Sequence, residues 1–488
     1  MTAERILLRQ GHYADSVTLM QVSRSVTEST GVQAALVAMA TDLNLQLLAG
    51  MGFGAPATDS ANDLLIAIRA IDESALAAAV VLAEQLLDAP RGLSANSGQE
   101  QLPPRTIGSA ATAHGSGLAV ISVPGQHAFT EAMDALEAGC DVLIFSDNVS
   151  LDQEIALKEV AAERGLLVMG PDCGTAVVGG IGLGFSHTLD PGPIGLVAAS
   201  GTGAQQVLCL LDAAGVGVSA ALGVGGRDLS EPVAGRSTRA ALNMLDQDVA
   251  TELILVVSKP PAAPVAEQVR AVAAGLATPV RFALLGPDQP DLTAGTEAAL
   301  RQLGVAVPSW PSWLASTEAV SGSIRGLFCG GTLCDEAMLL ASAVLGEVRS
   351  NIPLRPDWAL DGSLRSDGHW MIDFGDDTLT SGRAHPMIDP SLRNQRLVET
   401  AADPTTGVLL LDVLLGHGSH PDPVADLLPI IAGCRAPVVI SLIGARRDPQ
   451  DLAGSAARLA EAGASVFVSN AAATRYAISL IQQGESHE

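Results

Sequence analysis

The chain has 488 residues, of which 48% are apolar; this composition excludes a disordered protein and the length predicts about three or four domains. The formal net charge of −26 argues against nucleic acid and anionic membranes as partners, because the chain would repel their phosphate groups. The longest apolar run, near residues 75–83, is too short to cross a bilayer.

The cysteine and lysine contents give two further indications. Six cysteines without a CxxC pair are more typical of a reducing compartment than of a disulfide scaffold, and no signal peptide is evident, so we expect a cytoplasmic protein. Only Lys158 and Lys259 are lysines among the 27 basic residues. A position that stays lysine in such an arginine-rich chain is unusual, and this draws attention to Lys259.

Short runs of Val, Ile, Leu and Ala alternate with amphipathic stretches of helical length. This pattern predicts an α/β fold with parallel sheets that helices cover on both faces. Residues 1–90 are expected to form a small α/β domain, and residues 91–117, rich in Pro, Gly and Ser, a linker. In the first domain we expect strands at 5–8, 33–39 and 64–68, helices at 15–28 and 73–87, and a short helix between the second and third strands.

Residues 118–190 predict a Rossmann-like domain. Its expected strands are 118–123, 142–145 and 166–169, and its expected helices are 128–138 and 152–164. The first turn, at residues 123–127, contains one glycine and no GxGxxG motif, so dinucleotide binding is unsupported.

Residues 191–322 and 323–488 predict two flavodoxin-like domains. In the first, strands are expected at 194–198, 218–224, 253–257 and 280–285, with a helix at 204–214. In the second, strands are expected at 326–329, 370–374, 408–413, 438–443 and 465–469, with a helix at 334–345. Both open with a strand, a Gly-Thr turn and a helix, which indicates an internal duplication.

The two Gly-Thr turns are candidate phosphate sites. They comprise Ser200, Gly201, Thr202 and Gly203 in one domain and Gly330, Gly331 and Thr332 in the other. A helix start offers unpaired N–H groups and a partial positive charge, and glycine lets an anion approach the backbone. Alternatively, the glycines only permit a tight turn and the hydroxyl caps the helix. Two such turns in equivalent places favour convergence on one anion.

Charged residues follow two other strands of the first flavodoxin-like domain. Lys259 stands between Ser258 and Pro260, where it could neutralise a phosphate or carboxylate or simply lie in solvent. Arg227 and Asp228 follow Gly225-Gly226 and could bind substrate or form a local ion pair.

The loop before residue 395 carries a cluster of potential cations. Arg383, His385 and Arg393, with Asn394, follow an acidic strand exit at residues 373–377. They could hold a carboxylate substrate, and His385 could act as a general acid or base. The alternative is a structural loop tied to the acidic residues.

Three further residues give weak signals. Cys173 has no basic neighbour in the sequence, so a buried inert thiol is expected rather than a nucleophile. His417 and His420 lack a further clustered ligand, so no metal site is predicted.

Several of these segments resemble the α subunit of succinyl-CoA synthetase, namely Gly170-Pro171-Asp172-Cys173 and residues 194–202. Residues 323–488 resemble the carboxyl-terminal domain of that enzyme's β subunit. The resemblance implies a CoA-binding type of Rossmann-like domain followed by two ligase-type flavodoxin-like domains, without an ATP-grasp domain.

A more specific resemblance, over nearly the whole chain, is to the FdrA family. The motifs that carry it are Met20-x-x-Ser23-Arg24, Phe145-Ser146-Asp147-Asn148-Val149, Gly170–Thr175, Gly225–Leu229, Ser258–Pro261 and Arg383–Asn394. The resemblance implies a subunit of oxamate carbamoyltransferase in purine (allantoin) breakdown, acting with two companion proteins. That enzyme converts oxalurate and phosphate to oxamate and carbamoyl phosphate, and it requires no cofactor.

The chain departs from succinyl-CoA synthetase at its phosphate relay. After the strand at 280–285 it reads Gly286-Pro287-Asp288-Gln289, without the histidine that carries phosphate in that enzyme. Nucleotide-driven CoA ligation by this chain alone is therefore not expected.

Three readings stay open. The first is carbamoyl transfer. Phosphate would lie between the helices that begin near Ser200 and Gly330, and Lys259 and Arg227 would neutralise its charge. The second is an acyl-CoA synthetase-like ligase that binds CoA and works with a companion subunit. The third is a binding subunit without catalytic activity.

Overall fold

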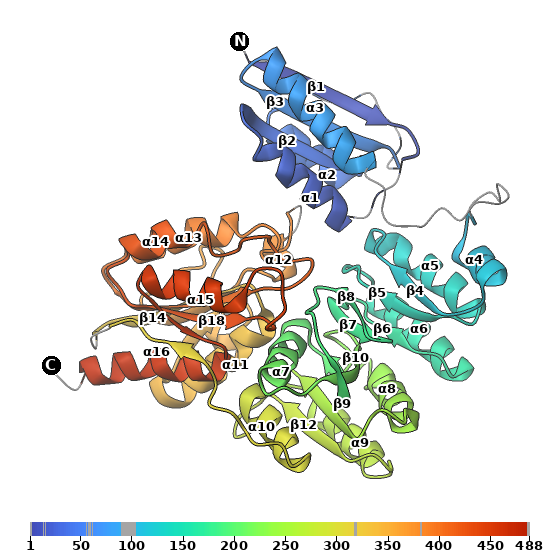
Figure 1. The fold of residues 1–488 in the computed structure, drawn as a ribbon, viewed down its shortest axis with the longest axis vertical. Helices are drawn as coiled ribbons and strands as arrows, with labels where there is room; N and C mark the ends of the chain where they lie inside the picture. The colour runs from blue at the N-terminus through green and yellow to red at the C-terminus, as the bar shows by residue number, and fades with distance from the viewer. Residues whose placement is uncertain are drawn as a thin grey trace. The chain divides into compact units, whose positions relative to one another are not determined.

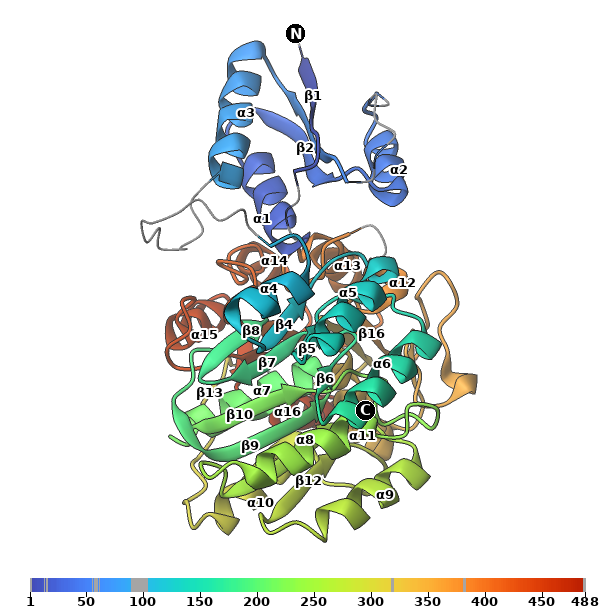
Figure 2. The same ribbon diagram turned by 90° about the vertical axis from the view of Figure 1, so that its right-hand side faces the viewer.

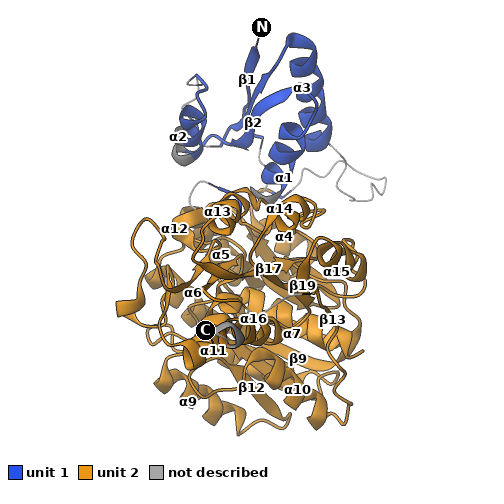
Figure 3. Ribbon diagram, turned by 90° about the vertical axis from the view of Figure 1, so that its left-hand side faces the viewer, with its two compact units in different colours: residues 1–104, 381–384 blue, residues 105–380, 385–488 orange. Residues whose placement is uncertain are grey.

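In a computed structural model of the chain, residues 2–12, 14, 16–54, 56, 60, 62–88, 104–316, 320–380 and 383–485 are described. The chain divides into two compact units (Figure 3). Unit 1 comprises residues 1–104 and 381–384, and unit 2 comprises residues 105–380 and 385–488.

Unit 1 contains a three-stranded antiparallel sheet in the order β1-β3-β2. Its elements are β1 (Ala3–Arg9), α1 (Ser16–Thr27), β2 (Val32–Met39), α2 (Asp42–Gly50), β3 (Leu64–Ala70) and α3 (Glu73–Asp88). All of β3 except Arg69 is buried, because this strand lies between the other two. Apolar side chains of α1 and α3 pack on one face of the sheet, and Leu48 and Phe53 pack on the other.

Unit 2 begins with a three-stranded parallel sheet in the order β4-β5-β6. Its elements are α4 (Ile107–His114), β4 (Leu118–Ile121), α5 (Gly125–Glu137), β5 (Asp141–Ile144), α6 (Leu151–Arg164) and β6 (Val168–Met169). Alanines and leucines of α5 and α6 pack against these strands. Figure 2 shows the two helices beside this sheet. This is the Rossmann-like domain that the sequence predicts.

A six-stranded sheet follows in the order β12-β11-β9-β10-β7-β8. Its elements are β7 (Thr175–Val178), β8 (Ile181–Gly184), β9 (Pro191–Ala199), α7 (Gly201–Ala213), β10 (Val218–Gly223), α8 (Arg236–Gln247), β11 (Leu253–Ser258), α9 (Ala263–Ala273), β12 (Val280–Leu284) and α10 (Leu292–Gln302). β9 pairs in parallel with both β10 and β11, and all six residues of β11 are buried. This burial explains the continuous apolar run in its sequence.

The last sheet has seven strands in the order β13-β19-β18-β17-β14-β16-β15. Its elements are β13 (Ser312–Trp313), β14 (Ser323–Phe328), α11 (Gly331–Leu345), β15 (Val348–Ser350), a 3-10 turn (Pro356–Trp358), β16 (His369–Asp373), α12 (Asp377–Thr380), α13 (Ser391–Ala401), β17 (Thr406–Leu414), α14 (Leu428–Gly433), β18 (Val438–Ile443), α15 (Leu452–Glu461), β19 (Ala464–Phe467) and α16 (Asn470–Glu485). The order β16-β14-β17-β18 repeats the order β10-β9-β11-β12 of the preceding sheet. This is the flavodoxin-like strand order, which confirms the predicted fold class.

Four helices form the layer between the two large sheets. α7 packs against α10 and α11, and α11 packs against α16 (Figure 1). The helices that open the two duplicated halves are therefore neighbours in this layer.

Three local expectations are wrong. The sheet of unit 1 is antiparallel rather than parallel, because β3 inserts between β1 and β2 in the opposite direction. Within the expected linker at 91–117, residues 107–114 form α4, which a Thr106–Ser109 capping box starts and which packs on α5; residues 91–103 lie outside the described residues. Strands β7 and β8 join the first flavodoxin-like sheet rather than the Rossmann-like sheet.

Across the described parts of the chain, no helix has the length and apolar content needed to cross a membrane.

Candidate functional site

The two Gly-Thr turns lie in contact within unit 2. The Ser200 Oγ donates a hydrogen bond to the Thr332 Oγ1 over 2.7 Å. A Cβ atom added to Gly330 would lie only 2.7 Å from the Thr202 Oγ1, so the backbone of the second turn also touches a side chain of the first. The starts of α7 and α11 therefore meet.

Both turns lie at the carboxyl ends of parallel strands, where the strand order reverses. Ser200 follows β9, which stands between β10 and β11, and Gly330 follows β14, which stands between β16 and β17. Ligands of open α/β sheets bind in the crevice at such a reversal. The duplication thus brings two such crevices to one place.

The start of α7 is capped by its own serine. Ser200 occupies the N-cap with extended backbone, and its Oγ accepts a hydrogen bond from the Gly203 N–H over 2.9 Å. Gly201 is exposed, and a Cβ atom added there would meet nothing within 4 Å. The first turn of α7 thus has open space beside its backbone.

The start of α11 is capped by a side chain from another strand. Gly330 at the N-cap has no side-chain capping bond. Instead, the Asp412 carboxylate at the end of β17 accepts hydrogen bonds from the Cys329 and Gly330 N–H groups over 2.6 and 2.9 Å. The Arg393 guanidinium lies 3.8 Å from the same carboxylate and donates to the Asp412 carbonyl oxygen over 2.7 Å.

A small recess opens beside the start of α7. Its lining comprises Asp172, Cys173, Gly174, Thr175, Ala198, Ser200, Gly201, Gly223, Gly225 and Gly226. Desolvation by the surrounding atoms raises the pKa of Asp172, and repulsion from Asp377 and Asp147 acts in the same direction. Solvent reaches much of the Asp172 side chain and weakens these effects.

Lys259 lies at the edge of this recess. It is exposed at the end of β11, and its Nζ would lie 3.7 Å from a Cβ atom added to Gly226. Its positive charge acts to lower the pKa of both Asp172 and Asp335, against the opposing effect of desolvation. Lys259 is therefore a cation close to two acidic residues, Asp172 beside the start of α7 and Asp335 in α11.

Arg227 and Asp228 differ in accessibility. The half-exposed Arg227 forms an ion pair with Glu154 over 2.9 Å and donates to the Val149 carbonyl oxygen over 2.8 Å. Asp228 is fully buried and accepts hydrogen bonds from the backbone N–H groups of Ser237 and Thr238. This geometry favours a structural role for Asp228.

Lys158 is the partner that the sequence reasoning missed. Its ammonium is 2.8 Å from both the Glu154 and Asp228 carboxylates, and it donates to the Val224 carbonyl oxygen over 3.0 Å. This buried network anchors the loop that carries Arg227. The available signal was that Lys158 is one of two lysines in the chain.

Two buried carboxyls surround the start of α11. Desolvation raises the pKa of Asp373 to about 8 and that of Asp412 to about 6. For Asp412, Arg393 and the two backbone donors act in the opposite direction. Asp373 ends β16, and its Oδ2 would lie 2.8 Å from a Cβ atom added to Gly331.

His385 lies beside the same strand exit. Its Nδ1 accepts a hydrogen bond from the Met387 N–H over 3.2 Å, and its ring packs 5.7 Å from the Phe185 ring. Desolvation lowers the pKa of His385 to about 4, so the ring is neutral near pH 7 and carries its proton on Nε2.

The other residues of the predicted cluster differ in burial and partners. Arg393 and Asn394 are buried, and Arg393 donates to the Cys329 sulfur over 2.9 Å as well as to the Asp412 carbonyl oxygen. Their geometry favours structural roles. Arg383 is exposed and belongs to unit 1, so its role stays a prediction.

The residues with weak signals are placed as follows. Cys173 is buried, and desolvation raises the pKa of its thiol to about 12, which favours an inert group. The His417 Nε2 lies 3.0 Å from the Thr188 Oγ1, and the His420 Nδ1 accepts from the Asp422 N–H. Among the described residues, no three or more His, Cys, Asp or Glu side chains are arranged to hold a metal ion.

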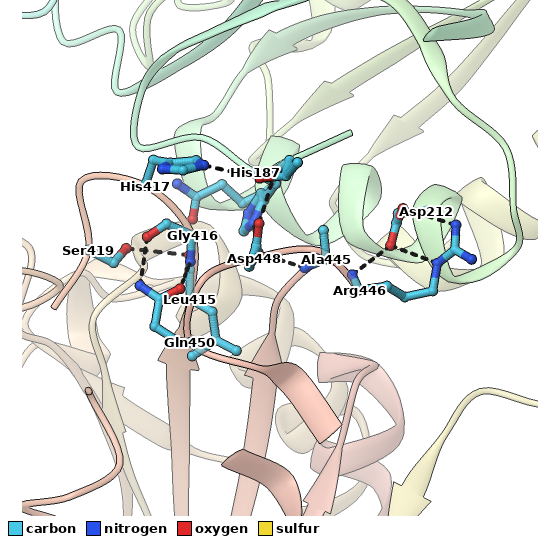
Figure 4. A network of polar contacts seen from close by, with 12 residues as sticks. His187, Asp212, Leu415, Gly416, His417, Ser419, Ala445, Arg446, Asp448 and Gln450 are labelled. Atoms are coloured by element: carbon cyan, nitrogen blue, oxygen red, sulfur yellow. Dashed lines mark hydrogen bonds and ion pairs between the residues drawn. The ribbon is translucent and has the colours of Figure 1, made fainter. Parts of the chain in front are cut away.

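A polar network joins the two flavodoxin-like sheets (Figure 4). The buried His187, after β8, lies with its Nδ1 2.6 Å from the Asp448 carboxylate, after β18. The Arg446 guanidinium binds Asp212 of α7 over 3.2 Å. These contacts connect α7 to the loops of the last sheet. No sequence signal identified them, because the partners are more than 230 residues apart.

Comparison with known proteins places the chain among its relatives. The chain is 40% identical over 456 residues to the uncharacterized protein YahF of Escherichia coli strain K12, covering 88% of both chains. The chain belongs to the YahF family. A family model described as CoA-ligase also matches residues 327–480, so this part of the chain is similar to CoA ligases. The FdrA name itself stays a prediction.

A second group of relatives covers part of the chain. The α subunit of ADP-forming succinate–CoA ligase from Aquifex aeolicus is 27% identical over 160 residues, 32% of this chain. The chain matches about half the length of that subunit, 51%. A solved acetyl-coenzyme A synthetase from Ca. Korarchaeum cryptofilum covers 75% of this chain, and the match covers 84% of that structure, at 15% identity and a TM-score of 0.28. A score this low adds nothing to the fold described above.

Residues 1–103 match a family described as the AllF heavy metal-associated domain. This segment contains no cysteine, and His12 is its one histidine. Soft metal ions prefer thiolate ligands, which the segment lacks. The residues present therefore do not fit a heavy-metal site, and we derive no metal chemistry from the match.

Proposed function

We propose that this chain binds phosphate, or the phosphoryl end of an acyl phosphate, between the starts of α7 and α11 and transfers an acyl group at that place. The observation that carries the proposal is the hydrogen bond of 2.7 Å between the Ser200 Oγ and the Thr332 Oγ1. It places the positive ends of two helix dipoles in contact at two strand-order reversals.

The specific reaction that we propose is carbamoyl transfer, in which oxalurate and phosphate give oxamate and carbamoyl phosphate. This reaction needs a phosphate site and a site for a small carboxylate, but no nucleotide. The absence of the relay histidine after β12 agrees with a reaction that uses phosphate directly. The chain would act with companion subunits, as the family resemblance implies.

Lys259 and Arg227 supply positive charge in this proposal. Lys259 is exposed beside the recess and, unlike Lys158, is not enclosed by carboxylates. Arg227 is held by Glu154, and its half-exposed guanidinium keeps donors for a ligand. His385 would contact the second substrate through its Nε2–H group, as a neutral donor.

The test is phosphate-dependent cleavage of oxalurate by the full chain copurified with its companion subunits. Lys259→Ala should lower kcat/KM by about 10- to 100-fold, because a hydrogen bond to a charged group contributes about 1.5–3 kcal/mol. Lys259→Arg, which keeps the charge, should retain most of the activity. Undiminished cleavage by Lys259→Ala would overturn the role of this lysine.

The second candidate function is acyl-CoA ligation with a companion subunit, which the CoA-ligase profile favours. Gly125 begins α5 in the first turn of the Rossmann-like domain, and a Cβ atom added there would lie 2.1 Å from the Asp147 carbonyl oxygen, so this turn packs closely against the backbone of residue 147. We derive no step through CoA. Protection of residues 105–190 from proteolysis by added CoA would support this second function.

A further inference from the structure

Asp373 is a buried carboxyl at the proposed phosphate site that the function above does not use. It is 6% exposed at the end of β16, and its Oδ1 accepts a hydrogen bond from the Gly375 N–H over 2.9 Å. Its Oδ2 lies against Gly331 in the first turn of α11. Among the described residues this Oδ2 has no hydrogen-bond partner. The surrounding atoms do not enclose it completely. One oxygen is thus fixed by the backbone, and the other faces the helix start.

The surroundings of Asp373 favour its neutral form. Desolvation raises its pKa to about 8, the Gly375 N–H opposes this, and the carboxylates of Asp412, Asp376 and Asp335 raise it further. His385 adds no positive charge, because its own pKa is lowered to about 4. A phosphate bound at the start of α11 would add negative charge and favour the proton more strongly.

We propose that Asp373 is the proton donor of the transfer reaction, with its Oδ2 facing the leaving group of a substrate held at the start of α11. This proposal rests on the proposed function and names a residue that neither the sequence nor the comparisons assigned. A protonated carboxyl also explains how an acidic strand exit can border an anion site, since an ionised Asp373 would repel phosphate.

The step balances without a further reactant. An oxygen of hydrogen phosphate forms a bond to the carbamoyl carbon of oxalurate, and the bond from that carbon to the amide nitrogen breaks. The electron pair of the broken bond stays on the nitrogen, which takes the proton from Asp373 and leaves as oxamate. The remaining proton of the phosphate then passes to the Asp373 carboxylate. Carbamoyl phosphate is released and the acid is restored.

The test compares Asp373→Asn with Asp357→Asn in the complex of the full chain with its companion subunits. The asparagine keeps the shape of the carboxyl but has no proton to transfer, so kcat should fall by about 100-fold or more. Binding of inorganic phosphate, measured by calorimetry at pH 7, should change by less than about threefold. Asp357 is a mostly exposed carboxyl in a surface ion pair with Arg355, and its variant should keep wild-type kcat.

The pH profile separates a proton donor from a structural residue. Wild-type kcat should fall as the pH rises through about 8, where Asp373 loses its proton. Asp373→Asn should lack this alkaline limb in its residual activity. Full activity of Asp373→Asn, or an unchanged alkaline limb, would overturn the proposal while leaving the proposed function intact. A wild-type complex that neither binds phosphate nor cleaves oxalurate would overturn both.

An independent readout needs no activity. The folded-state pKa of Asp373 is raised, so between about pH 4 and pH 8 the folded state holds a proton that the unfolded state has lost. The contribution of Asp373 to stability is therefore fully present below this range and is lost as the pH rises through about 8. Urea denaturation at pH 5, 7 and 8.5 should show a smaller decline for Asp373→Asn than for the wild type. An equal decline would overturn the protonated state on which the proposal depends.

Discussion

The starts of α7 and α11 come from similar sequences but are completed in different ways. Ser200 caps α7 from within its own turn, whereas α11 depends on the carboxylate of Asp412 from a neighbouring strand. The first start has a neutral serine cap and is partly open to solvent, and the second has two buried carboxyls close by. A duplicated motif therefore predicts where two helices begin, but not which groups cap their first N–H groups.

This difference matters for anion binding. A neutral cap leaves the partial positive charge of α7 available, while Asp412 already offsets part of the charge at α11. A proton on Asp373 would keep this second start from becoming too negative for a phosphate. The two starts would thus contribute unequally to one site, and variants of each should show unequal effects.

The largest effect is expected at the cap of α11. Asp412→Ala would leave two backbone N–H groups without their acceptor and Arg393 buried without its carboxylate. Removing one partner of a buried charged pair costs about 3–5 kcal/mol, so the free energy of unfolding should fall by about that amount. Urea denaturation measures it.

The matched control is an exposed acid in an ordinary surface ion pair. Asp357 lies 3.2 Å from Arg355, with both side chains mostly exposed. Asp357→Ala should lower the free energy of unfolding by less than about 1 kcal/mol. Equal losses for Asp412→Ala and Asp357→Ala would mean that the buried carboxylate does not hold the start of α11.

The glycines of the two turns should respond in opposite ways. A Cβ atom on Gly330 would come within 2.8 Å of three atoms of Thr202, so Gly330→Ala should cost about 1–3 kcal/mol by overpacking. Gly201→Ala adds a methyl group in open space and should be neutral or stabilising by up to about 1 kcal/mol. Thermal denaturation of both variants checks this contrast, and a stable Gly330→Ala protein would contradict the close contact of the turns.

Much of the fold follows from local pattern. The apolar run of β11 and the turn before α7 are visible in the sequence, because burial and helix starts impose short-range constraints. The antiparallel direction of β3 and the pairing of β7 with β10 depend on long-range contacts that alternation does not encode. Helix α4 was missed because Pro, Gly and Ser around it indicated a linker, although its capping box is local.

The candidate site divides along the same line. The Gly-Thr turns could be predicted, and duplication suggested that they converge. The partners Lys158, Asp412 and the His187–Asp448 pair could not, since each joins segments far apart in the chain. For Arg393 the ligand contact stays a prediction, and the sequence does not show that its guanidinium also donates to Cys329 and to the Asp412 carbonyl oxygen.

The smallest effect is expected at the contact between the two helix starts. Ser200→Ala removes the cap of α7 and the donor to the Thr332 Oγ1, and cap loss costs about 1 kcal/mol. Thr332→Val removes the acceptor while keeping its shape.

A double-mutant cycle separates the contact from the cap. If the hydrogen bond links the two starts, the Ser200→Ala and Thr332→Val losses should not add, and the coupling energy from urea denaturation should be about 0.5–1.5 kcal/mol. Additive losses would mean that each start is held by its own half alone, Ser200 for α7 and Asp412 for α11. In that case, each substitution should weaken phosphate binding by the same factor whether or not the other substitution is present. If the two starts are coupled, weakening one start should also reduce what the other start contributes to phosphate affinity.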